Sequence, residues 1–180
     1  MDERSDNELM LLLRGESREA LGTLFARHHR SVYALCYRMT GDTAVADDLA
    51  QESFLRLLRY KENFDGRSLF TTWLYRVVRN LCLDHLSRRK RERRMQERLS
   101  LETEDGDVDG APDDRVELLE RALYALDPDK REVIVLSRFQ GLNYREIAQV
   151  LECSVGAVKT RAHRALRELR ATFQKLEQEA

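Results

Sequence analysis

The sequence predicts an all-α protein with two small helical domains joined by an acidic, flexible linker. The chain of 180 residues has only 8 glycines and 2 prolines, and its apolar residues recur over long stretches at the 3.6-residue spacing of amphipathic helices. Residues 100–114 hold two glycines, a proline and almost no apolar side chains, a composition typical of a linker. We therefore expect a first domain at 1–94, the linker at 95–114 and a second domain at 115–180.

Helical periodicity defines three helices in the first domain. The first two, at about 17–39 and 43–60, are separated by a break at Gly41. The turn residues of 63–68 predict a loop, and a third helix follows at about 69–91. Apolar residues at i, i+3 and i+4 give each helix one face for a shared core.

The second domain is expected to begin with two helices and to continue into a helix-turn-helix. The first two lie at 115–125 and 129–140, and Pro128 suits the first turn of the second one. Asn143 caps the next, short helix, and Glu146 three residues on completes a capping box. A three-residue turn then leads to a longer helix.

That longer helix begins after Ser154, its expected cap, and is basic on its outward face. The outward residues are Lys159, Thr160, His163, Arg164 and Arg167, with Arg161 at the edge. In a helix-turn-helix, cations on this face neutralise phosphates while side chains near the helix start reach base edges in the major groove. The alternative is an αα-hairpin whose arginines are only solvated.

The net charge of −1 hides strong segregation. Residues 61–101 carry 11 basic and 5 acidic residues, and residues 115–175 carry 12 and 8, whereas residues 102–114 carry 7 acidic residues and no basic one. Two basic blocks around an acidic strip predict two surfaces that face a polyanion. Solvated helix surface is the alternative.

The segment after the predicted loop combines aromatic and basic residues. Phe70 and Trp73 stand beside the loop, and a basic helix face follows them. This pattern suits stacking on unpaired bases next to duplex phosphates. Core packing of the aromatics, and an i,i+4 pair between Asp84 and Arg88, are the alternatives.

Several classes of protein are excluded by composition and motif. The N-terminus is acidic and lacks the apolar stretch of a secretory signal, and no apolar run reaches the roughly 18 residues of a membrane helix. The three cysteines are scattered, the histidines have no metal-ligand spacing, and no phosphate loop or nucleophile motif occurs. We expect a cytoplasmic protein that is not an enzyme, with no catalytic residue, metal or cofactor.

Three segments of the sequence resemble a known family, the bacterial RNA polymerase sigma factors. Residues 70–89 of this chain are similar to the segment with which sigma factors melt and read promoters. The motif is Phe70-x-x-Trp73-Leu74-x-Arg76-x-x-Arg79-Asn80-x-x-x-Asp84-x-x-x-Arg88-Arg89. Residues 47–54 resemble their core-polymerase-binding helix, and residues 142–169 resemble their C-terminal helix-turn-helix. The order of these motifs resembles the extracytoplasmic-function (ECF) class, which keeps only regions two and four.

The resemblance implies three sets of site residues. The first set binds the core polymerase: Asp48, Gln51 and Glu52. The second set recognises and melts the minus-ten element: Asn63, Phe64, Arg67, Trp73, Arg76, Arg79, Asn80, Asp84 and Arg88. The third set contacts the minus-thirty-five element: Lys159, Thr160, Arg161, His163 and Arg164. The implied partners are core RNA polymerase, promoter DNA and an anti-sigma factor, with no insertion into a membrane.

Three positions depart from the family pattern. Trp73-Leu74 replaces the two adjacent tryptophans of housekeeping sigma factors, which implies weaker melting and stricter promoter choice. Glu152 stands in the turn where relatives often have glycine, and a positive φ there would cost on the order of 1 kcal/mol. Ala157 stands where many relatives have threonine.

A stand-alone helix-turn-helix regulator is the competing interpretation. Such a protein needs no core-binding patch, and it usually needs a dimer because one recognition helix reads too little sequence.

Overall fold

The computed structural model describes residues 3–98 and 114–179, and all regular secondary structure in this part of the chain is helical, with no β-strand. The all-α prediction is therefore confirmed. The greater part of the expected acidic linker, residues 99–113, lies outside the described residues.

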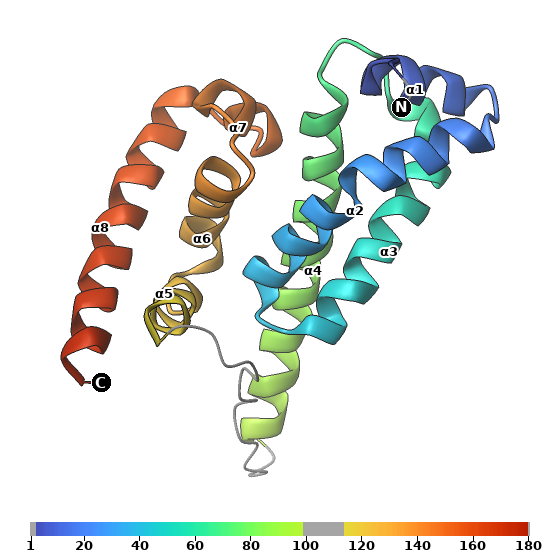
Figure 1. Ribbon diagram of the computed structural model, residues 1–180. Helices are drawn as coiled ribbons and strands as arrows, with labels where there is room; N and C mark the ends of the chain where they lie inside the picture. Colours follow the sequence, from blue (N-terminus) through green and yellow to red (C-terminus); the bar gives the residue numbers. More distant parts are fainter. Residues whose placement is uncertain (1–2, 99–113, 180) are drawn as a thin grey trace.

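The first domain is a bundle of four helices (Figure 1). Helix α2 (Arg18–Thr40) and helix α3 (Thr43–Arg59) are joined by a tight turn in which Gly41 has a φ of 76°. A 3-10 turn (Lys61–Asn63) and a loop then lead to α4 (Phe70–Arg98), the longest helix of the chain. These helices correspond to the three that periodicity predicts.

Helix α1 (Asp6–Arg14) was not predicted from the sequence. A capping box begins it, in which Ser5 Oγ accepts a hydrogen bond from the Glu8 N–H and the Glu8 carboxylate accepts one from the Ser5 N–H. Its inward face is buried through Leu9, Met10 and Leu13. The Ser5-x-x-Glu8 spacing ahead of these apolar residues is the sequence pattern that would have revealed the helix.

The second domain consists of α5 (Asp114–Tyr124), α6 (Pro128–Ile134), α7 (Tyr144–Val150) and α8 (Val155–Glu179). Pro128 lies in the first turn of α6, as expected. The helix predicted over 129–140 is present, because α6 continues without a break into a π-helical turn (Val135–Phe139); the change to π-helical geometry after Ile134 was not predicted.

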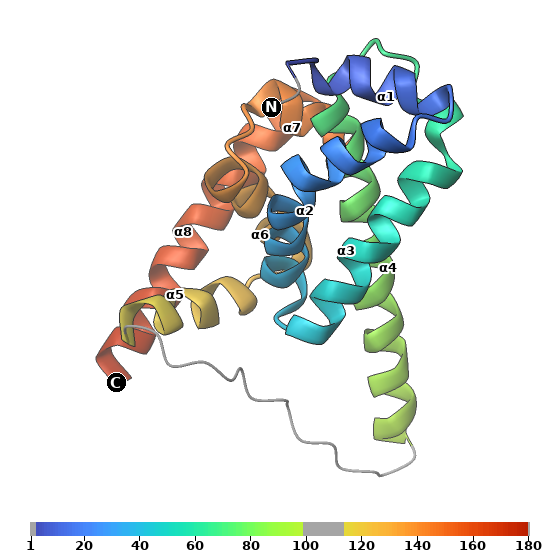
Figure 2. The same ribbon diagram turned by 45° about the vertical axis from the view of Figure 1, so that its right-hand side comes forward.

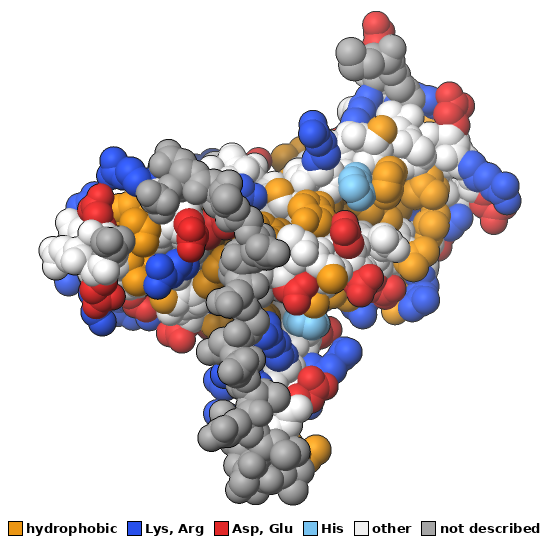
Figure 3. Space-filling model, turned by 60° about the horizontal axis from the view of Figure 1, so that its bottom comes forward, with side chains coloured by type: hydrophobic (Ala, Val, Ile, Leu, Met, Phe, Trp, Pro, Cys, Tyr) orange, Lys and Arg blue, Asp and Glu red, His pale blue; other side chains and the backbone are white. Residues whose placement is uncertain are grey.

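The two domains pack side by side, with α5, α6 and α7 of the second facing α2 and α4 of the first (Figures 1 and 2). One continuous set of buried apolar residues runs through both. Helix α4 continues well past the bundle and ends four residues inside the expected linker. Residues 87–96 of this projecting end are exposed, and Figure 3 shows Lys and Arg side chains beside acidic ones at this end of the molecule.

Candidate nucleic-acid interface

Helices α7 and α8 form the predicted helix-turn-helix, and both expected caps are present. Asn143 Oδ1 accepts hydrogen bonds from the N–H groups of Arg145 and Glu146, and the Glu146 carboxylate accepts one from the Asn143 N–H at 2.8 Å. Ser154 Oγ accepts a hydrogen bond from the Ala157 N–H at 3.1 Å. These bonds satisfy N–H groups that the first turn of a helix leaves unpaired.

The outward face of α8 leaves most of the predicted minus-thirty-five residues open to solvent. The exposed residues are Lys159, Thr160, His163 and Arg164, with Arg167 further along. The inward face is buried through Val158, Ala162 and Ala165. Arg161 is different: it is half-buried, and its Nη1 lies 3.1 Å from Glu132 Oε1.

The turn between α7 and α8 holds Glu152 in the left-handed region, with a φ of 53°. The condition for the expected strain is therefore met, at a cost of about 1 kcal/mol relative to glycine. The Glu152 side chain reaches the first domain, where its Oε1 lies 3.2 Å from Arg76 Nη1.

The predicted minus-ten loop separates into exposed and buried residues. Asn63 and Arg67 are exposed, whereas Phe64 is only 1% exposed. The Phe64 ring packs edge-on against Phe70 and Trp73, with centroid distances of 6.3 and 6.0 Å. The Phe64 side chain therefore supports the loop from the core, and its assignment to the minus-ten element stays a prediction.

On α4 the predicted minus-ten residues follow one helix face. Asn80, Asp84 and Arg88 are exposed, and Trp73, Arg76 and Arg79 are half-buried.

His85 lies on the same helix. Its burial and the positive charges of Arg89 and Arg88 lower its pKa below the ordinary value, whereas the carboxylates of Asp42 and Glu92 act in the opposite direction.

Two arginines of this face bind the second domain. Arg76 Nη2 donates to the Gln149 carbonyl at 2.6 Å. Arg79 Nε and Nη2 lie 2.6 and 3.2 Å from the two carboxylate oxygens of Glu132. Glu132 is 1% exposed, and its burial raises the pKa of its carboxyl against the opposing effect of Arg79 and Arg161.

Sequence reasoning missed Glu132 and its neighbour Arg131. Arg131 is 7% exposed and donates to four carbonyl oxygens, those of Met39, Leu123, Tyr124 and Leu126. Burial lowers the pKa of its guanidinium. The only sequence pattern that could have indicated this role is a charged pair directly before the apolar run 133–136.

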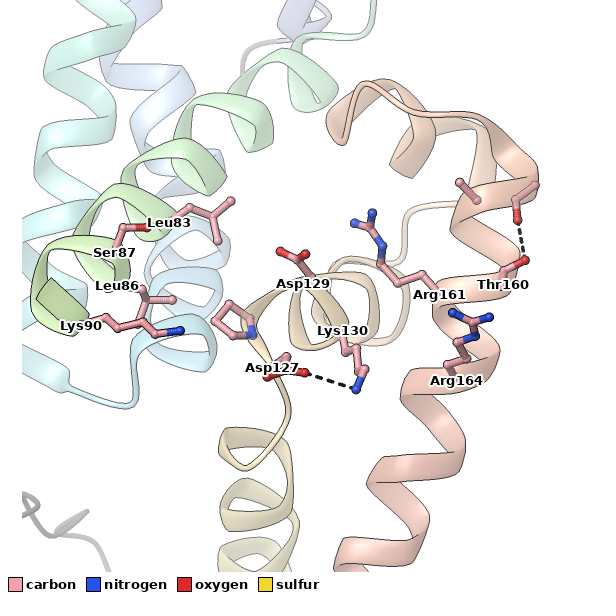
Figure 4. Close-up of a pocket in the computed structure, with 13 residues that line it drawn as sticks. Leu83, Leu86, Ser87, Lys90, Asp127, Asp129, Lys130, Thr160, Arg161 and Arg164 are labelled. Carbon is pink, nitrogen blue, oxygen red and sulfur yellow. Dashed lines mark hydrogen bonds and ion pairs between the residues drawn. The ribbon is translucent and has the colours of Figure 1, made fainter. Parts of the chain in front are cut away.

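A cleft of about 800 Å³ lies between α4 and α8. Leu83, Leu86 and Lys90 of α4 form one wall, and Thr160, Arg161 and Arg164 of α8 face them across α6 (Figure 4). The cleft therefore combines an apolar strip on α4, from Leu83 and Leu86, with basic groups on both sides, Lys90 of α4 and Arg161 and Arg164 of α8.

The predicted core-polymerase patch lies on the outer side of α3. Asp48 and Gln51 are exposed, and Glu52 is half-buried with its Oε1 3.1 Å from Arg56 Nε. Leu55, one turn on from this patch, is 55% exposed. Sequence reasoning did not include Leu55.

These features define a helical two-domain protein with a polar patch on one bundle and basic faces on α4 and on a helix-turn-helix. Two family profiles match it: "Sigma-70 region 2" at residues 24–92 and "Sigma-70, region 4" at residues 117–169. The chain belongs to the extracytoplasmic-function class of RNA polymerase sigma factors, which direct transcription from promoters.

Its relatives include the sigma factor CarQ of Myxococcus xanthus, 34% identical over 170 residues that cover 92% of this chain and 96% of CarQ. The ECF sigma factor SigW of Bacillus subtilis is 34% identical over 157 residues, 81% of this chain and 84% of SigW. The solved structure of CnrH in complex with the cytosolic domain of CnrY is similar, with 27% identity and a TM-score of 0.74 over 96% of this chain and 99% of that one.

Within residues 3–98 and 114–179, no helix is both long and apolar enough to cross a bilayer.

Proposed function

We propose that this sigma factor binds core RNA polymerase through the outer face of α3 and reads promoters through two separate surfaces. Asp48, Gln51, Glu52 and the adjoining Leu55 make up the core-binding face. The protein has no chemistry of its own in this proposal, and it acts in the cytoplasm. The stand-alone regulator is not favoured, because profiles of both sigma regions match the chain.

The observation that carries the proposal is the position of the exposed residues on α8. Lys159, Thr160, His163 and Arg164 lie within the first three turns, directly after the Ser154 cap. In a helix-turn-helix, this end of the second helix enters the major groove. These residues, together with Arg161, are proposed to contact the minus-thirty-five element.

The minus-ten element is proposed to bind along the loop and the face of α4. Exposed Asn63, Arg67, Asn80, Asp84 and Arg88 support this assignment, since their polar groups are accessible. Trp73, Arg76 and Arg79 complete the set, and Phe64 is left out because it is buried. Two of these residues, Arg76 and Arg79, must first leave the second domain.

An anti-sigma factor is proposed as the third partner. The similarity to CnrH, which was solved in complex with the cytosolic domain of CnrY, supports a protein partner for this chain. The cleft between α4 and α8 has the chemistry to receive an amphipathic segment, since Leu83 and Leu86 give it an apolar strip and Lys90, Arg161 and Arg164 give it basic groups.

Run-off transcription with core polymerase tests the function, and charge reversal on α3 tests the core-binding face. Asp48→Arg with Glu52→Arg is expected to abolish co-purification with core while the helical circular dichroism spectrum is retained, because both side chains point away from the bundle. Glu19→Arg with Glu117→Arg makes the same charge change at exposed sites on other helices and is the control. Wild-type core affinity in the α3 variant would refute the assignment.

A further inference from the structure

The two domains meet through side chains that the proposed function assigns to promoter DNA. Arg76 binds the Gln149 carbonyl and the Glu152 carboxylate, and Arg79 binds Glu132. We call this packing of the two domains the closed state.

In the closed state, each end of the Arg79 guanidinium has a protein partner. Nε and Nη2 contact the Glu132 carboxylate, and Nη1 donates to Asn80 Oδ1 at 3.2 Å. A guanidinium binds a phosphate or a base most strongly through two parallel N–H donors, and the Nε and Nη2 pair of Arg79 is occupied by Glu132. A bidentate contact of this edge with minus-ten DNA therefore requires that Glu132 be released.

Glu132 also holds an arginine of the other promoter-reading set. Its Oε1 lies 3.1 Å from Arg161 Nη1 on α8 and 3.2 Å from Arg79 Nη2 on α4. One buried carboxylate thus joins the minus-ten and minus-thirty-five surfaces. A carboxylate this deeply buried requires charged partners, because an unpaired buried charge is strongly unfavourable.

The cleft beside this contact places the recognition helix opposite α4. Thr160, Arg161 and Arg164 line it on one side and Lys90 on the other (Figure 4). A cleft of about 800 Å³ has the size of a small-molecule or peptide site. In the closed state Arg161 is half-buried against Glu132, whereas Thr160 and Arg164 stay exposed, so closure engages one residue of the minus-thirty-five set.

We propose that Glu132, which pairs with Arg161 of its own domain, locks the free sigma factor in the closed state by binding Arg79 of the minus-ten surface. This inference rests on the proposed function for the identity of the competing ligand, promoter DNA. Opening breaks the contact with Arg79, whereas Arg161 and Glu132 lie in the same domain and stay together. Arg79 is therefore the part of the lock that DNA must capture.

Glu132→Gln is the direct test in the full-length protein without polymerase. The amide cannot compensate two guanidinium charges, so we expect the equilibrium between closed and open states to shift by about 10- to 100-fold towards open. X-ray scattering should then report a larger radius of gyration than that of the wild type. Glu168→Gln is the matched control: it removes one carboxylate that pairs with Lys130 inside the second domain, and it should leave the radius unchanged.

Arg79→Gln opens the lock from the first domain and keeps the test valid if Glu132→Gln disturbs folding. The two variants together should be no more open than either alone, because both remove the same contact. Binding of a random-sequence DNA duplex gives a second readout. Glu132→Gln should release Arg76, Arg79 and Arg161 for contacts with phosphates. The slope of the logarithm of the DNA-binding constant against the logarithm of the salt concentration should therefore become steeper by up to about 3 units.

The proposal is overturned if both lock variants have the radius of gyration of the wild type and the same salt dependence of DNA binding. It is also overturned if the wild-type protein is already as open as the two variants. Scattering needs neither polymerase nor promoter, so it tests the lock independently. A failure of the sigma function would instead appear as absent run-off transcription by the wild-type protein with core.

Discussion

Replacing Arg131 with methionine tests whether a buried guanidinium holds the second domain together. The side chain donates to the carbonyls of Leu123, Tyr124 and Leu126, where α5 ends, and to that of Met39 at the end of α2. These carbonyls lie near helix ends, where helical hydrogen bonding runs out, and that of Leu123 also accepts a hydrogen bond from the Leu126 N–H at 3.2 Å. Methionine has a similar length but cannot donate, so all four acceptors lose this partner.

The magnitude follows from the number of bonds and from the burial. Each hydrogen bond from a charged donor contributes about 1.5–3 kcal/mol, and removing the charge recovers a desolvation penalty of several kcal/mol. We expect a net loss of about 3–5 kcal/mol in the free energy of unfolding of the second domain. At about 4–8 °C per kcal/mol for a domain of this size, its melting temperature should fall by about 12 °C or more.

Thermal unfolding of the full-length chain provides the assay. The single tryptophan, Trp73, lies in the first domain, so its fluorescence follows that domain while circular dichroism at 222 nm follows both. Arg170→Met removes an exposed arginine from α8 and should change stability by less than about 0.5 kcal/mol. If Arg131→Met melts within about 2 °C of Arg170→Met, the carbonyl contacts do not stabilise the domain and the reasoning is wrong.

Three further predictions concern the turn, the pH dependence and the recognition helix. Glu152→Gly should stabilise the second domain by about 1 kcal/mol in urea unfolding, since glycine adopts the positive φ without strain; a loss of stability would mean that the contact with Arg76 outweighs the strain. The folded state lowers the pKa of His85, so the stability that this residue contributes is present above its ordinary pKa and is lost as the pH falls. His85→Gln should therefore lose less free energy of unfolding than the wild type between about pH 7 and 5. Equal losses in the two proteins would refute this prediction. Arg164→Ala should relax the preference at one minus-thirty-five position at a cost of about 1–3 kcal/mol, whereas Arg167→Ala should weaken all promoters alike and reduce the salt slope by roughly one counterion. An unchanged preference for Arg164→Ala in a promoter-library selection would contradict that assignment.

The helices of both domains could be predicted because their causes are local. Apolar spacing, the Asn143 and Ser154 caps and the break at Gly41 all lie within a few residues of the structure that they determine. Helix α1 was missed although its capping box is equally local. The π-helical geometry after α6 was missed because a π-helical turn has no distinct apolar period.

The contacts between the domains could not be predicted, because they join residues far apart in the chain. Arg79 and Glu132 are 53 residues apart, and a charged residue in a helical pattern is ordinarily assigned to the surface. The same limit applies to Phe64, which the family resemblance assigned to the minus-ten loop and whose ring packs on Phe70. The core-binding and promoter-reading residues remain predictions from the family resemblance.

The acceptors on α2 have a consequence for how the sequence of this protein can change over evolution. Gln140 donates to the carbonyl of Ser31, Tyr124 to that of Tyr37, and Arg131 to that of Met39. Every amino acid supplies a main-chain carbonyl, so side-chain replacements at these three α2 positions leave the acceptors in place. For these three hydrogen bonds, evolution is therefore more constrained in the second domain, which supplies the donor side chains, than on α2. Elsewhere α2 is constrained as well, because Tyr37 Oη donates to Glu120 and the Arg38 guanidinium lies over the Phe139 ring.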